Sequence, residues 1–204
     1  MRDYSRFDEF LTRISGHVYP EKPSEPHLSI TRTKIESLFG RGLIKSGMRV
    51  LDVGCGQGLA LEHFRRLGLE ATGITLGPDY EVCRAKGFDV QEMDQNFMSF
   101  GIGEFDILWC RHVLEHSVAP LFTLSEYRRI TKPNGLVYIE VPAQDTSAHH
   151  ETNPNHYSIL PMSSWVSLFS RAGFLIEEGA ELKFTVPCGT DMYLSFLLRR
   201  HCGE

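Results

Sequence analysis

The stretch VLDVGCGQG, from Val50 to Gly58, decides the fold. Its apolar residues suit a buried strand, three glycines follow at alternate positions (Gly54, Gly56 and Gly58), and a helical pattern, GLALEHFRRLG, comes next. Glycine permits a tight turn and lets a ligand approach the backbone closely. In α/β folds such a turn lies at the carboxyl edge of the strands, where ligands bind. The stretch therefore predicts a strand, a ligand-binding turn and a helix.

The spacing of these glycines differs from the dinucleotide-binding fingerprint. The pattern G-x-G-x-x-G would need glycine or a close substitute at position 59, which is Leu59. Asp52 stands just before the turn, and its carboxylate suits a ligand that carries a cation nearby. We therefore expect a nucleotide-like cofactor with a cationic group rather than a dinucleotide held by its phosphates.

Outward from this turn, short apolar runs alternate with helical patterns. Runs such as FDILW (105–109) and LVYIEV (136–141) are bounded by turn residues and suit strands that are buried on both faces. This alternation predicts a doubly wound α/β fold with a mostly parallel sheet and helices on both faces. Two extended segments, 173–184 and 191–200, are expected to close the sheet as a hairpin.

Two segments outside this pattern are expected to cover the site. Apolar residues at helical spacing predict two amphipathic helices before the main fold, separated by the proline-rich segment YPEKPSEPHLS (19–29). The stretch from Pro142 to Leu160 has no clear periodicity, and loops of that length in a compact domain are often functional. The predicted organisation is an N-terminal helical lid and linker (1–45) and a cofactor-binding domain (46–204).

Composition excludes several classes of protein. The chain has 204 residues, a formal net charge of −5 and 42% hydrophobic residues, which is typical of a globular domain. The charge and the lack of a basic domain argue against nucleic acid as a partner, and no run approaches the length of a membrane-spanning helix. Five cysteines without a C-x-x-C pair suggest a reducing compartment, so we expect a soluble, cytoplasmic protein.

With these motifs in order, the chain resembles the class I S-adenosylmethionine-dependent methyltransferases. The resemblance rests on VLDVGCGQG and on four later segments: ATGIT (71–75), FDVQEMD (88–94), FDILWCRHVLEH (105–116) and RITKPNGLVYIEVP (129–142). It implies a Rossmann-like, seven-stranded sheet whose last strand is antiparallel, and S-adenosyl-L-methionine as the cofactor. The segment FDILWCRHVLEH is similar in particular to small-molecule and quinone-modifying members.

The resemblance also implies which residues bind the cofactor. The glycine loop would cradle the methionine and ribose parts, and Asp94 would bond the adenine amino group, although its residue type also suits a cap of the next segment. Cys55 is expected to be a small buried residue rather than a nucleophile. The full expected set is Asp52, Gly54, Cys55, Gly56, Gly58, Thr75, Leu76, Asp94, Gln95 and Arg111.

One position departs from the family pattern. The family usually has Asp or Glu at the end of the second strand, where it holds the ribose hydroxyls, whereas this chain has Thr75. A similar G-I-T-L run occurs in the cyclopropane fatty acid synthase branch, which uses the same cofactor. The cofactor prediction therefore stands, and the ribose contact is left open. The missing acid also argues against NAD.

Histidines are the candidate catalytic bases. Methyl transfer is a displacement on an activated group, so the protein mainly aligns the acceptor and removes its proton. His116, shortly after the fourth strand, and His156, in the long loop, are the candidates, each as base or as acceptor-orienting group. His116 can equally bond to the helix after it. No metal site is predicted in HHETNPNH (149–156), because adjacent loop histidines usually point in different directions.

The favoured hypothesis is methyl transfer to an O or N atom of a small molecule or glycan intermediate. Two alternatives stay open: a non-catalytic S-adenosylmethionine-binding regulatory protein, and an NAD-dependent oxidoreductase or epimerase. The sequence determines neither the acceptor nor the oligomeric state.

Overall fold

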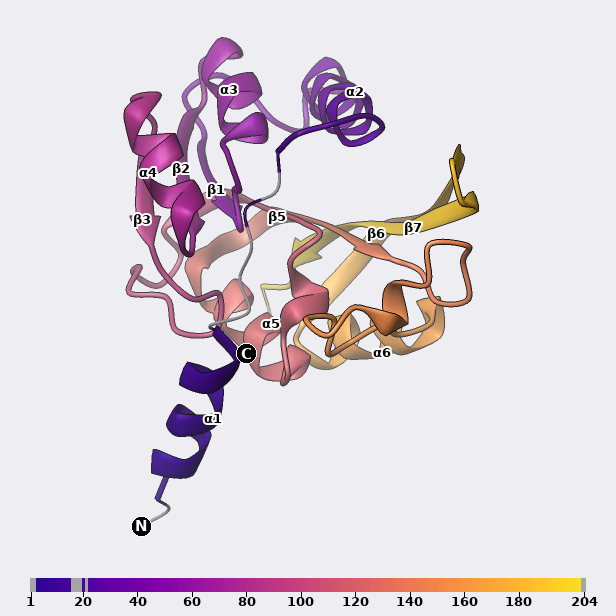
Figure 1. Cartoon of the computed structure of the whole chain (residues 1–204). Helices are drawn as coiled ribbons and strands as arrows, with labels where there is room; N and C mark the ends of the chain where they lie inside the picture. The colour runs from indigo at the N-terminus through magenta and orange to yellow at the C-terminus, as the bar shows by residue number, and fades with distance from the viewer. Residues whose placement is uncertain (1–2, 16–19, 21, 203–204) are drawn as a thin grey trace.

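The computed structural model describes residues 3–15, 20 and 22–202. Its strands are β1 (Arg49–Val53), β2 (Glu70–Thr75), β3 (Asp89–Glu92), β4 (Phe105–Arg111), β5 (Thr131–Pro142), β6 (Phe174–Val186) and β7 (Gly189–Arg200). They form one sheet in the order β3-β2-β1-β4-β5-β7-β6, in which β7 runs antiparallel to both β5 and β6 (Figure 1). The predicted Rossmann-like fold and the hairpin at the sheet edge are confirmed.

Helices cover both faces of this sheet (Figure 1). They are α1 (Ser5–Ser15), α2 (His27–Gly40), α3 (Leu59–Arg66), α4 (Pro78–Ala85), α5 (Pro120–Ile130) and α6 (Met162–Arg171), with short 3-10 turns at Leu114–His116 and His150–Thr152. Helix α4 begins at Pro78, a position where proline is tolerated because the first N–H groups of a helix have no partner within the helix. The stretch between β5 and α6 contains a single 3-10 turn, so the predicted long loop is also confirmed.

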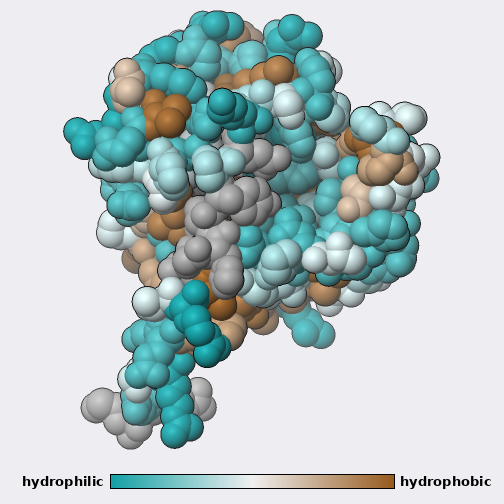
Figure 2. Space-filling view, viewed as in Figure 1, coloured by the Kyte–Doolittle hydropathy of each residue, from teal (hydrophilic) through white to brown (hydrophobic). Residues whose placement is uncertain are grey.

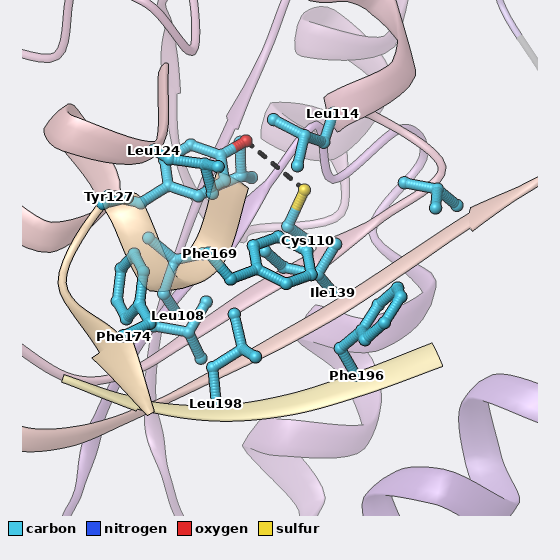
Figure 3. Packing of buried hydrophobic residues seen from close by; sticks show 14 of the residues in the cluster. Leu108, Cys110, Leu114, Leu124, Tyr127, Ile139, Phe169, Phe174, Phe196 and Leu198 are labelled. Carbon is cyan, nitrogen blue, oxygen red and sulfur yellow. Dashed lines mark hydrogen bonds between the residues drawn. The ribbon is translucent and has the colours of Figure 1, made fainter. Parts of the chain in front are cut away.

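The two faces have separate cores because side chains alternate along each buried strand. On one face, Tyr127 of α5 and Phe169 of α6 pack against strand residues such as Cys110 (Figure 3). The Cys110 thiol and the Tyr127 hydroxyl lie 3.3 Å apart within this core. On the other face, α2 and α3 pack against the sheet around Trp109. Burial on both faces fixes β1 and β4, and with them the loops that follow these strands.

The N-terminal segment divides into two parts in the structure. Helix α2 begins at His27, inside the predicted linker, and its Ile35 and Leu38 are buried in the core beside Phe64 of α3. Helix α1 instead projects from the body of the domain, and its surface is mostly hydrophilic on the visible side (Figures 1 and 2). Its Leu11 and Ile14 nevertheless line a cavity at the carboxyl edge of the sheet.

Candidate active site

Two cavities meet at the carboxyl edge of the parallel strands. The larger has a volume of about 240 Å³ and the smaller about 140 Å³. Three residues line both of them: Gly54, Gly56 and His112. The glycine loop after β1 and the first residue after β4 therefore lie at the junction of the two cavities.

The three glycines of the loop are explained by two different structural reasons. A Cβ atom at Gly54 would lie 2.2 Å from a methyl carbon of Val113, and one at Gly58 would lie 2.5 Å from the Phe88 ring. At Gly56, which has φ +49°, the nearest atom to such a Cβ is an Asp79 carboxylate oxygen 3.9 Å away. Gly54 and Gly58 thus permit close packing, whereas Gly56 leaves open space for a ligand. Gly58 lines neither cavity.

The larger cavity begins between β2 and β3. Thr75, Leu76, Asp94 and Gln95 all line it, as the sequence prediction requires. Asp94 Oδ1 accepts hydrogen bonds from the Asn96 backbone N–H (2.7 Å) and side-chain amide (2.8 Å), so this carboxylate also caps the segment after it. The Gln95 amide donates to the Val113 carbonyl and accepts from the Tyr127 hydroxyl. Gln95 therefore holds the wall of the cavity in place.

A carboxylate that sequence reasoning missed lies in the same cavity. Asp79, in the first turn of α4, is buried, and its Oδ1 accepts a hydrogen bond of 3.1 Å from the Gln57 amide. It stands four residues after Thr75, where the strand-end acid is missing. Its place on the next helix rather than on the strand is the reason that the family pattern did not reveal it.

The smaller cavity holds one buried carboxyl group and one buried guanidinium group. Asp52 and Arg111 both line it, with Cys55 and with Thr31 of α2. Burial raises the pKa of Asp52 well above its ordinary value, and the positive charge of Arg111 opposes that shift. Arg111 Nε lies 2.7 Å from Glu140 Oε1, while its Nη2 is buried and has no hydrogen-bond partner among the described residues. The cavity thus offers a buried donor without a partner among the described residues, beside a buried carboxyl group.

Cys55 is a buried thiol beside a second thiol. A hydrogen bond with Cys83, together with burial, raises the pKa of Cys55 far above its ordinary value. The Cys83 thiol donates to the Gly56 carbonyl over 3.1 Å. The protonated form of Cys55 is therefore favoured, and the Cys83 thiol supports the glycine loop through its hydrogen bond to Gly56.

Of the two histidines expected from the sequence, His116 lies in the wall of the larger cavity and His156 lies behind it. His116 lines the cavity beside Asn155 and Tyr157, and its Nδ1 donates to the Asn155 carbonyl at 2.8 Å. His156 lies behind, with its ring centroid 5.0 Å from that of His116, and it lines neither cavity. Burial, with the charge of His116, lowers the pKa of His156 to about 4. His116 faces the cavity, and His156 packs against it.

Among the described residues, three side chains bring possible metal-ligand atoms close together. One ligand atom each of Glu115, His116 and His156 lie within 4.8 Å of one another. The sequence predicts no metal site, and this cluster is the observation among the described residues that bears on that prediction.

Comparison with known proteins identifies the family of this chain. A family model described as a methyltransferase domain matches residues 29–178. The chain belongs to this methyltransferase family. The methyltransferase domain is 30% identical over 143 residues to the ubiquinone biosynthesis O-methyltransferase of Xanthomonas oryzae pv. oryzae, across 66% of this chain and 59% of that protein. The chain thus spans about 59% of the length of that curated relative.

Solved structures share the architecture of this methyltransferase domain at low sequence identity. The cyclase SpnF superposes with a TM-score of 0.71 at 19% identity, over 98% of this chain and 94% of that one. The Haemonchus contortus phosphoethanolamine N-methyltransferase 2, bound to S-adenosylhomocysteine, gives 0.70 at 16% identity, over 83% and 52%. These likenesses show the fold. None of the described helices combines the length and apolar character that crossing a bilayer needs.

Proposed function

We propose that this methyltransferase domain transfers a methyl group from S-adenosyl-L-methionine to an oxygen or nitrogen atom of a small molecule or glycan intermediate. The observation that carries the proposal is the pair of cavities that meet at the open Gly56, with ionic groups at one end and carboxylates at the other. A long ligand that crosses the glycine loop would fill both.

The residues present fit the methionine end of this cofactor. Its ammonium group suits Asp52, and its carboxylate suits the buried Arg111 Nη2, which has no hydrogen-bond partner among the described residues. A buried donor without a partner typically costs about 1–3 kcal/mol, so an anion there is favoured. Cofactor binding would also favour the ionised form of Asp52, whose pKa burial raises.

The residues at the other end fit the adenosine part. Asp94 is the proposed hydrogen-bond acceptor for the adenine amino group. Thr75 has no carboxylate to hold the ribose hydroxyls, and the buried Asp79 supplies that contact instead. Both carboxylates are acceptor-only when ionised, which matches hydroxyl and amino donors.

The acceptor would enter where His116, Asn155 and Tyr157 line the larger cavity. The bound cofactor supplies an activated methyl group, so the protein has to align the acceptor and take up its proton. We propose His116 as the first candidate and His156 as the second for base or acceptor-orienting group. The curated relatives are named O-methyltransferases, which favours a hydroxyl acceptor.

The remaining features support a small-molecule enzyme of a reducing compartment such as the cytoplasm. Cysteines at all five positions are free thiols. The net charge of −5 offers no general attraction for nucleic acid. Helix α1 and the loop from 143 to 160 are the proposed covers of the site, because both contribute lining residues to the larger cavity.

Calorimetry tests the proposal directly. We expect the protein to bind S-adenosylmethionine and S-adenosylhomocysteine and not NADH. Binding of NADH without binding of either sulfur compound would contradict the assignment. Binding without methyl transfer to a broad panel of acceptors would instead support the non-catalytic alternative.

Asp94→Asn is expected to weaken S-adenosylhomocysteine binding by about 1–3 kcal/mol. The substituted side chain keeps an oxygen for Asn96 but presents an amide donor where the adenine amino group needs an acceptor. Titration calorimetry measures the change, and Asp89→Asn, an exposed carboxylate at the start of β3, is the control. Equal affinities for Asp94→Asn and wild type would show that adenine is not held here.

Asp79→Ala is expected to weaken adenosine binding by roughly 1.5–3 kcal/mol, the range for hydrogen bonds to a charged group. The loss should vanish for 2′,3′-dideoxyadenosine, which lacks the ribose hydroxyls. Affinities of both nucleosides for both proteins give the comparison. An equal loss for the two nucleosides would assign Asp79 to the support of Gln57 instead.

A further inference from the structure

His112 lies at the junction of the two cavities. It follows β4 directly and lines both cavities. Its backbone has φ +56°, a left-handed conformation that a residue other than glycine adopts at some cost. Its N–H donates to the Glu140 carbonyl at 2.8 Å, which holds the turn. A strained, well-anchored residue at a ligand junction is typical of a functional position.

The His112 ring is held by a carboxylate that is itself fixed. His112 Nε2 lies 3.2 Å from Glu140 Oε1, and Glu140 is fully buried. The Tyr138 hydroxyl donates to Glu140 Oε2 at 2.6 Å, and Arg111 Nε lies 2.7 Å from Oε1. An ionised carboxylate can only accept, so the proton sits on Nε2 and the lone pair on Nδ1.

Burial favours the neutral form of the His112 ring, and the nearby carboxylates partly oppose this effect by favouring its charged form. Burial lowers the pKa of His112 to about 4, against the opposing hydrogen bond of Glu140. Burial opposes ionisation of Glu140, but the His112 and Tyr138 hydrogen bonds and the Arg111 charge lower its pKa to about 2. His112 Nδ1 also lies 3.7 Å from Glu115 Oε1. Carboxylates therefore flank both ring nitrogens.

We propose that His112 is the catalytic base of the methyl transfer and that Glu140 is its positioning residue, a proposal that rests on the function proposed above. The O–H bond of the acceptor breaks, and its proton passes to His112 Nδ1. The oxygen keeps the electron pair and uses it to bond the methyl carbon, while the sulfur retains the pair of the broken C–S bond. The imidazolium, stabilised by Glu140 and Glu115, later releases its proton to water. His116 then orients the acceptor rather than ionising it.

Two phenolic probes separate a base from a residue that only shapes the site. Catechol is protonated at a neutral assay pH, whereas 4-nitrocatechol is largely ionised and needs no base. His112→Asn, which tolerates the left-handed backbone, should lose about 10²–10⁴-fold in turnover of catechol. With 4-nitrocatechol it should stay within a few-fold of wild type. His149→Asn is the matched control, since His149 also has a left-handed backbone (φ +49°) but an exposed side chain.

Equal losses with both probes would overturn the proposal, because a base is needed only for the protonated acceptor. Glu140→Gln should show the same selectivity to a smaller degree, and its melting temperature reports whether the variant folds. These comparisons also distinguish the two proposals: if S-adenosylhomocysteine does not bind to wild type, the proposed function itself has failed.

A second measurement is independent of any acceptor. Nitrogen-15 NMR of the histidine rings, in the protein bound to S-adenosylhomocysteine, should show His112 neutral at neutral pH with its proton on Nε2. The assignment comes from the signal that His112→Asn removes. A ring that carries both protons, or one whose only proton is on Nδ1, has no lone pair on Nδ1 and would overturn the proposal even if neither probe is methylated.

Discussion

Gly56→Val is expected to remove measurable S-adenosylhomocysteine binding while the domain remains folded. Gly56 lines both cavities, and no protein atom lies closer than 3.9 Å to the position of an added Cβ. The valine side chain would therefore occupy the ligand space instead of displacing protein atoms. Titration calorimetry measures the loss, and circular dichroism verifies the fold.

Gly42→Val is the control for this substitution, because Gly42 also has a left-handed backbone but lines neither cavity. Gly42 has φ +70°, and nothing lies within 4 Å of an added Cβ. Gly42→Val should lose about 1–2 kcal/mol of stability from the left-handed conformation and retain full cofactor affinity. If Gly56→Val binds as tightly as Gly42→Val, the cofactor does not cross the glycine loop.

His116→Ala is expected to lower methyl-transfer turnover by about 10²–10⁴-fold, with cofactor affinity close to wild type. The ring lines the larger cavity where we propose that the acceptor enters, and the Asn155 carbonyl fixes its orientation. An acceptor that loses this contact would lie out of line with the methyl group. Single-turnover rates with the phenolic probes, beside calorimetry with S-adenosylhomocysteine, separate the two effects.

Substitution of two other histidines tests whether the loss of turnover is specific to His116. His156→Ala should have a smaller effect, because His156 contacts the His116 ring but lines neither cavity. His149→Ala should have none, since that side chain is exposed. A wild-type rate for His116→Ala would remove His116 from the acceptor site.

The sequence predicts the parts of the site that depend on local structure. Strand, glycine turn and helix are consecutive, so VLDVGCGQG positions Gly54 and Gly56 without knowledge of the rest of the chain. The apolar runs of β4 and β5 likewise indicate buried parallel strands, since neither face needs polar residues.

The parts of the site that depend on tertiary contacts could not be predicted from the sequence. His112 and His116 are both close to the end of β4, and the sequence favours His116. The left-handed turn at His112 and its bond to Glu140, 28 residues later, arise only when β4 pairs with β5. The absence of an acid at Thr75 is visible in the sequence, whereas its replacement by Asp79 depends on how α4 docks. The burial of α2 in the core likewise depends on its partner, α3.

The left-handed backbone of His112 also bears on attempts to make this protein more robust. Glycine adopts that conformation without the steric conflict that a Cβ brings, a difference of roughly 1–2 kcal/mol. Relief of backbone strain alone would therefore favour glycine at position 112, but the substitution would also remove the hydrogen bond to the buried Glu140 and the imidazole that lies between the two cavities. Gains in heat resistance at this residue would come at the expense of turnover, so a stability screen should hold it constant.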